Sequence, residues 1–355
     1  PPVASNQMRM RHLCVLLAGS LLWASQEPPQ AFRATVNIVL APTTVVDKDG
    51  NHVPGLKPSD FRLYDKGELQ DIKVDVAYQP ISLVVAVQAD AVMESVLPNV
   101  QRIGSMLQPL VFGEHGEAAV LCFDHRIQVL QEFTNDPDKI IQAMKKIRPG
   151  SSSSRLNDAV NEAVRLLRRR PEDRRRVILL ISESRDKGSE GRVRETLAAA
   201  EFQNVSLYAV IVPRLVTAFT SKPMAPRPDP VPAAAGHVPA GAPLTPDNTA
   251  GARYYGNVMP AFEEIIRGVK SIFVPNPVEV FTKYTGGRET SFMNLKDLER
   301  AVSSIANELH SQYLISYNPS NKMEGGYHEI KVVIPSRPEL KVRTRPGYWL
   351  AAVPQ

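Results

Sequence analysis

Cysteine is scarce in this sequence of 355 residues, which contains only Cys14 and Cys122. Cys14 lies in an N-terminal segment with the features of a secretory signal, so cleavage of that signal leaves Cys122 alone. We therefore expect no disulfide within the mature chain, and its stability has to come from a packed core. The composition allows such a core, because 43% of the residues are hydrophobic and 22% are charged.

The sequence also lacks an apolar run long enough to cross a membrane, which takes about 20 residues. The N-terminal apolar stretch Leu13–Trp23 is shorter, follows the basic residues Arg9 and Arg11, and precedes Ala24. This order predicts a signal peptide at residues 8–24 and an exported protein of the periplasm, the cell envelope or the extracellular space, with no membrane span after cleavage. An uncleaved helix at the membrane surface is the alternative.

Several catalytic motifs are absent. The sequence contains no Gly-x-x-x-x-Gly-Lys, no His-Glu-x-x-His and no Gly-x-Ser-x-Gly, which argues against a P-loop nucleotide site, a zinc metalloprotease and an α/β-hydrolase. The stretch "CFDHR" places Cys122 and Asp124 on one face of a strand and His125 on the other. This arrangement does not suggest a Cys–His nucleophilic pair, and we expect no catalytic residue and no cofactor.

The positive charge is concentrated in one run, "RLLRRRPEDRRR" at Arg165–Arg176, within a formal net charge of +5. The run follows an expected helix, where the helix dipole favours cations, and precedes a buried strand. It has no interleaved aromatic residues on which bases could stack. We interpret it as a solvated loop and expect no nucleic-acid partner.

The hydrophobic pattern divides the chain into β, α/β and β parts. Residues 33–78 alternate apolar and polar residues around turns at Gly50, Gly55 and Gly67. Residues 79–310 alternate apolar strands with helices, which indicates a mostly parallel sheet covered on both faces. Residues 311–350 return to a β pattern. We expect the two β segments to pack together, because each is too small to bury a core alone.

Individual elements of the α/β part can be predicted from the same pattern. The expected strands are Ile81–Val87, Ala118–Phe123, Ile127–Leu130, Val177–Ile181, Ser206–Val212 and Glu279–Tyr284. The expected helices cover Val92–Leu110, a segment capped by Asn135, a segment beginning near Leu156, Gly191–Phe202 and a segment capped by Asn294. Residues 214–257 are rich in Pro, Ala and Gly without apolar periodicity, and we expect a disordered insert there.

The order of elements resembles the von Willebrand factor A (VWA) family, in particular its exported VWFA-related group in acidobacteria. The stretches "QADAVM", "GSSSSRLNDAV" and "VILLISESRD", the Gly286-Gly287 pair and the terminal "RTRPGYW" carry this resemblance. It implies an α/β fold of the VWA type: a doubly wound, mostly parallel sheet with helices on both faces, plus a small β unit formed by the N- and C-terminal segments.

The resemblance also implies where a cation would bind. VWA domains hold a divalent cation with Asp-x-Ser-x-Ser after the first strand, a Thr from a second loop and an Asp from a third, and this metal-ion-dependent adhesion site bridges to a carboxylate of the partner. Here Gln88, Asp90 and Val92 stand at the first three positions, Ser154 at the Thr position and Glu183 at the last Asp position. We therefore expect a degenerate site, in which Asp90, Ser154 and Glu183 would bind Mg²⁺ or Ca²⁺ only weakly.

Three functions fit these expectations to different degrees. The first is an exported, non-enzymatic VWA-type module that binds a protein partner through the strand-end residues Gln88, Asp90, Val92, Ser154 and Glu183. The second is a structural or assembly subunit of a cell-envelope complex. The third is a hydrolase that uses Asp90 or Glu183, and it has the least support because no base is paired with a nucleophile.

Overall fold

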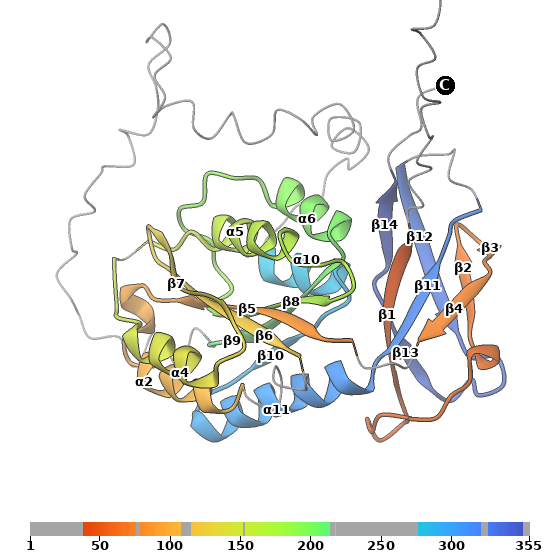
Figure 1. The fold of residues 1–355 in the computed structure, drawn as a ribbon, viewed down its shortest axis with the longest axis horizontal. Coiled ribbons are helices and arrows are strands. Elements are labelled where there is room, and N and C mark those ends of the chain that lie inside the picture. Colours follow the sequence, from red (N-terminus) through yellow and green to blue (C-terminus); the bar gives the residue numbers. More distant parts are fainter. Residues whose placement is uncertain are drawn as a thin grey trace, which may run out of the picture. The chain divides into compact units, whose positions relative to one another are not determined.

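The centre of the chain folds into a six-stranded sheet with helices on both faces (Figure 1). The structure is a computed structural model that describes residues 38–75, 79–107, 115–151, 153–213, 217, 276–320 and 326–350. These residues all belong to one compact unit. The expected signal peptide at 8–24 lies outside the described residues, as does the expected insert at 214–257 except for Thr217.

The strand order of the central sheet is β10-β9-β8-β5-β6-β7, parallel except for the outer strand β7. Its strands are β5 (Ile81–Gln88), β6 (Glu117–Phe123), β7 (Ile127–Thr134), β8 (Arg175–Ser182), β9 (Val205–Ile211) and β10 (Glu289–Ser291). Its helices are α2 (Leu97–Arg102), α4 (Pro137–Lys146), α5 (Leu156–Arg168), α6 (Val193–Phe202), α10 (Pro277–Tyr284) and α11 (Leu295–Ser311). Short 3-10 turns cover Ala91–Met93 and Ile103–Ser105.

The helices form two layers, with α5, α6 and α10 on one face of the sheet and α2, α4 and α11 on the other (Figure 1). Each layer packs apolar side chains against one side of the same strands, so β5 and β9 are buried along their whole length. This explains the continuous apolar runs in the sequence, because a strand covered on both faces has no polar side.

A smaller β-sandwich is built from both ends of the described chain. Its first sheet has the order β13-β1-β11-β4 and its second the order β14-β12-β2-β3. The strands are β1 (Val39–Val46), β2 (Arg62–Asp65), β3 (Glu68–Leu69), β4 (Ile72–Asp75), β11 (Tyr313–Tyr317), β12 (Gly326–Val333), β13 (Lys341–Arg343) and β14 (Gly347–Leu350), with a 3-10 turn at Pro58–Asp60. Because β1 pairs with β11 and β2 pairs with β12, neither end of the chain forms a sheet alone. The expected fold class is thereby confirmed.

Three local expectations need correction. Glu279–Tyr284 is part of helix α10 and not a strand, because the Asn276 side chain caps the helix, Pro277 fits its first turn, and Val278 and Phe281 bury one helical face. The helix expected at Val92–Leu110 is shorter and broken into α2 and two 3-10 turns. Helix α4 is capped by Asp136 and not by Asn135.

The Arg-rich run is engaged by its own chain. Arg170 forms an ion pair with Glu117 at 2.7 Å and Arg174 forms one at 3.2 Å. The Arg170 guanidinium also lies 4.9 Å from the centre of the Phe133 ring. Arg176 donates to the backbone oxygen of Gln203 at 3.1 Å. These contacts fasten the loop before β8 to neighbouring strands and to the end of α6.

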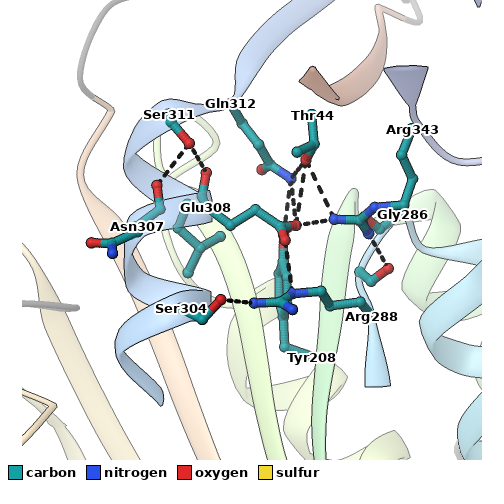
Figure 2. A network of polar contacts seen from close by, with 12 residues as sticks. Thr44, Tyr208, Gly286, Arg288, Ser304, Asn307, Glu308, Ser311, Gln312 and Arg343 are labelled. Atoms are coloured by element: carbon teal, nitrogen blue, oxygen red, sulfur yellow. Dashed lines mark hydrogen bonds and ion pairs between the residues drawn. The ribbon is translucent and has the colours of Figure 1, made fainter. Parts of the chain in front are cut away.

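The sandwich and the α/β body meet at the buried carboxylate of Glu308, in the last turn of α11 (Figure 2). Its Oε1 accepts from the Tyr208 hydroxyl at 3.0 Å and also contacts the Arg343 guanidinium. Its Oε2 lies 2.8 Å from Arg288 Nε. Gln312 Nε2 donates to the Tyr208 hydroxyl and to Thr44 Oγ1, both at 2.9 Å. One carboxylate therefore joins side chains from β1, β9 and β13.

The sandwich and the α/β body also approach each other at Glu201 and Arg345, which form no direct ion pair. Glu201 in α6 is 4% exposed, and neither of its carboxylate oxygens has a hydrogen-bond partner among the described residues. Burial raises the pKa of Glu201 to about 8, although the charge of the buried Arg345, just before β14, lowers it in part. Near neutral pH, Glu201 is therefore held mostly in its protonated form.

We predict that Glu308→Ala lowers the free energy of unfolding by about 1–3 kcal/mol, because it leaves the buried Tyr208 hydroxyl without its acceptor and the half-buried Arg288 and Arg343 without their counter-charge. Urea denaturation measures this change. The matched control is Glu299→Ala on the same helix, where Glu299 is only half-buried. A loss for Glu308→Ala no larger than for the control would show that the network does not hold the two parts together.

We predict that stability falls with pH through Glu201. The folded state keeps this carboxyl protonated up to about pH 8, whereas its usual pKa is 4.5, so the stabilisation is lost as the pH rises between these values. Glu201→Gln keeps the neutral form at every pH. The variant should therefore gain stability relative to the wild type when urea denaturation is repeated at pH 9 instead of pH 6. An equal difference at both pH values, as expected for the exposed control Glu132→Gln, would contradict the prediction.

Candidate functional site at the carboxyl ends of the sheet

The parallel strands β5, β6 and β8 end at the same edge of the central sheet. Backbone hydrogen bonds hold the loops after them together. The Ala89 N–H donates to Phe123 O at 2.8 Å, the Gly150 N–H donates to Ala89 O at 2.6 Å, and the Ala91 N–H donates to Ser151 O at 2.8 Å. We call this surface the strand-end face; it comprises residues 88–93, 123–126, 150–151, 153–155 and 182–192.

Gln88, the last residue of β5, is fully buried at this face. Its side-chain Oε1 accepts a hydrogen bond from the Glu183 N–H at 2.8 Å, which ties the end of β5 to the end of β8. Its Nε2 has no well-aligned acceptor among the described residues. The oxygen of Gln88 is thus already used, and the group that remains is a hydrogen-bond donor.

Asp90 follows two residues later and is also fully buried. Burial raises the pKa of its carboxyl to about 6; the Gln88 amide and the Lys187 charge lower it in part, and the Glu183 charge raises it. Although the Gln88 amide lies near, neither oxygen of Asp90 has a well-aligned hydrogen bond from a described residue. A carboxylate that is buried without partners is costly, so this side chain calls for a functional explanation.

Glu183, just after β8, has partners from its own chain. Thr217 Oγ1 donates a short hydrogen bond to Glu183 Oε1. Lys187 Nζ lies 3.9 Å from Glu183 Oε2. The Lys187 backbone N–H in turn donates to Ser154 O at 2.9 Å, so the loop after β8 is tied to the loop before α5.

Further polar side chains at this edge are buried without partners in the described part of the chain. They are Ser154 Oγ, Ser182 Oγ and both side-chain amide atoms of Asn157. Each unpaired buried group costs about 1–3 kcal/mol. Unpaired buried groups also occur elsewhere, at Glu201 for example, but five residues of this edge carry them: Gln88, Asp90, Ser154, Asn157 and Ser182.

Asp124, His125 and Ser151 form a second polar cluster on the face. Asp124 Oδ2 accepts from the Ser151 N–H at 3.0 Å, and this approach requires Gly150, where a Cβ would lie 2.0 Å from Asp124 Oδ2. His125 Nδ1 lies 2.8 Å from Ser151 Oγ and 3.0 Å from Asp124 Oδ2. A hydrolytic triad needs a different ring nitrogen for each neighbour, so this cluster is not one. It shapes the loop.

The structure brings together most of the residues that the sequence singled out. Gln88, Asp90 and Glu183 interact with one another, whereas Ser154 joins them through the backbone of its loop and Val92 is half-buried beside them. Sequence reasoning missed Lys187 and Thr217, which lie after the matched motifs. Within the described ranges, no group of three or more His, Cys, Asp or Glu side chains is arranged to hold a metal ion.

Comparisons with known proteins agree with this geometry. Residues 88–185 match the family model of the von Willebrand factor type A domain. The match begins at Gln88 and ends just beyond Glu183, so it contains Asp90 and Ser154 as well but not Lys187. No curated protein sequence matches the chain.

Several solved structures are similar to the chain. The conserved hypothetical protein BatB from Bacteroides thetaiotaomicron shares 15% identity, with a TM-score of 0.40 over 64% of this chain and 99% of that one. An aerotolerance-related membrane protein from Bacteroides fragilis shares 12% identity, with a TM-score of 0.38 over 64% and 99%. The von Willebrand factor domain of the type V pili tip protein Mfa5 from Porphyromonas gingivalis shares 19% identity, with a TM-score of 0.27 over 31% and 40%.

Proposed function

We propose that this chain, which contains a von Willebrand factor type A domain at residues 88–185, is a non-enzymatic module that binds a protein partner through its strand-end face. One observation carries the proposal: buried polar side chains without partners gather at the carboxyl edge of the sheet. That edge is where open α/β sheets bind their ligands. Unpaired buried groups lower stability, so recognition is the role that best accounts for them.

We propose further that the metal-ion-dependent adhesion site is degenerate. A divalent cation such as Mg²⁺ or Ca²⁺ needs about six or more oxygen ligands. Asp90 and Ser154 offer unpaired oxygens, but Val92 has none and the Gln88 oxygen is bonded to the Glu183 N–H. The donor set does not fit a divalent cation, so we assign no binding step to one.

The contacts at the face also support the absence of catalysis. Glu183 is held by Thr217 and Lys187, and Asp90 lies beside the Gln88 amide, which is neither a base nor a nucleophile. His125 cannot relay a proton between Asp124 and Ser151, because a single ring nitrogen faces both. We therefore do not propose a hydrolase.

The features of residues 8–24 support an exported location, and we propose that the partner is another exported or envelope protein. In the part of the chain that the structure describes, no helix is both long and apolar enough to cross a membrane.

A structural subunit of an envelope complex is a second candidate function. It is favoured by the sandwich, whose outer strands are β4 and β13 in one sheet and β3 and β14 in the other. An outer strand offers backbone groups to which a strand of another protein can be added.

We predict that about 1 mM Mg²⁺ in place of a chelator changes the melting temperature by less than about 1 °C, because a bound ion stabilises only when its concentration exceeds its Kd. The triple variant Gln88→Asp, Asp90→Ser and Val92→Ser restores the missing oxygens and should respond to Mg²⁺ if Ser154 and Glu183 reach the ion. A clear Mg²⁺-dependent rise in the melting temperature of the unmodified protein, abolished by Asp90→Ala, would contradict the prediction. It would indicate that the site binds a metal ion that can bridge to the partner.

We predict that the immobilised chain captures a partner from native envelope extract and that Val92→Trp prevents this capture, because it places a large side chain on the strand-end face. Mass spectrometry identifies the captured protein. The matched control is Arg169→Trp, at an exposed position just after α5 and before β8. Chelator should not change the wild-type result. Capture of the same partner by both Trp variants would argue against the strand-end face and in favour of assembly through the sandwich.

A further inference from the structure

Lys187 brings a positive charge to the acidic residues of the strand-end face. Its Nζ lies 3.9 Å from Glu183 Oε2, and its charge acts on the carboxyl of Asp90. Its backbone N–H is fixed to Ser154 O at 2.9 Å. Lys187 is thus connected to all three residues that would otherwise bind a divalent cation.

The loop that carries Lys187 is held in place by Asp186. Its Oδ1 accepts from the Ser189 N–H at 3.1 Å and from the Gly188 N–H at 3.3 Å, and its Oδ2 accepts from the Asn157 N–H at 3.4 Å. The last contact joins the loop to the first turn of α5. The loop therefore positions the Lys187 backbone before any partner arrives, which lowers the entropic cost of binding.

The charges of the face are separated by depth. The acidic side chains of Asp90, Asp124 and Glu183 are buried. The basic residues Arg126, Arg185 and Lys187 are exposed, whereas the one exposed acid of the face, Glu190, is paired with Arg155 at 3.3 Å. The side chain of Lys187 is 33% exposed and its ion pair with Glu183, at 3.9 Å, is a long one, so the ammonium keeps N–H donors that can be directed to solvent. The face thus presents positive charge to an approaching molecule, and its charge is complementary to acidic groups.

We propose that the ammonium of Lys187 takes the place of the divalent cation at this face and binds a carboxylate side chain of the protein partner. This inference rests on the proposed function and names the chemistry of the partner. The ammonium lies close enough to offset part of the charge of Glu183 and Asp90, and its exposed N–H donors remain for a carboxylate of the partner. A metal ion is not needed, because a cation is already supplied by the chain.

A hexaglutamate peptide labelled with fluorescein is a direct probe of this chemistry, with binding followed by fluorescence anisotropy. Lys187→Met keeps most of the apolar stem and removes the charge, so it should weaken binding about tenfold, the effect of about 1.4 kcal/mol. Lys187→Arg keeps the charge and should stay within about threefold of the wild type. The control Lys331→Met, at an exposed position in β12, should change nothing. Chelator and 1 mM Mg²⁺ should give the same affinity.

Three results would overturn the inference. They are an affinity of Lys187→Met within twofold of the wild type, a requirement of the wild-type protein for Mg²⁺, and no wild-type binding at millimolar peptide. Equal competition by free glutamate at the same carboxylate concentration would also count against a polypeptide ligand. Circular dichroism melting confirms that each variant is folded. The proposed function fails separately, if Val92→Trp still captures the native partner.

Discussion

The arrangement of this protein depends on the buried carboxylate of Glu308. Its helix runs directly into the sandwich, with Gln312 between α11 and β11. Burial, followed by the charge of Glu308, raises the pKa of the Tyr208 phenol, so the hydroxyl keeps its proton and remains a donor to the carboxylate. Arg343 connects the carboxylate to β13, an outer strand of the sandwich, and Arg288 connects it to the segment before β10. A charge buried this deeply is tolerated only because so many donors surround it.

The two polar regions of the molecule differ in how far their groups are satisfied. Around Glu308, each partner is engaged more than once, and Arg175 even fixes the orientation of the Gln312 amide by contacting its Oε1. At the strand-end face, Asp90 and Ser154 are buried with unpaired oxygens. A satisfied network stabilises a single structure, whereas unpaired groups reduce stability and are retained where they serve recognition. This contrast distinguishes the Glu308 network from the candidate site; at the second junction contact, Glu201 is also buried without a partner.

The sequence predicted those parts of the fold that have a local signal. Continuous apolar runs located the central strands, and the Gly286-Gly287 pair marks a real constraint, because a Cβ at Gly287 would lie 1.8 Å from Leu207 O. The helix at Pro277–Tyr284 was mistaken for a strand since its alternating residues fit a period of two, and only the Asn276 cap with buried Val278 and Phe281 decides otherwise. Of the candidate site, motif positions were predictable, but the roles of Lys187 and Thr217 depend on contacts between distant loops.

The pairing of β1 with β11 and β13 has a consequence for how the chain is made. Thr44 and Gln312, which hydrogen-bond at the junction, are 268 positions apart in the sequence. During synthesis, β1 therefore emerges long before the strands that pair with it, and its apolar residues Val39, Ala41 and Val45 stay uncovered until β11 and β13 have been made. The α/β body, whose strands follow one another closely, can fold before then. Of the two described parts, the sandwich is therefore the later to close, although it contains the earliest residues of the described chain.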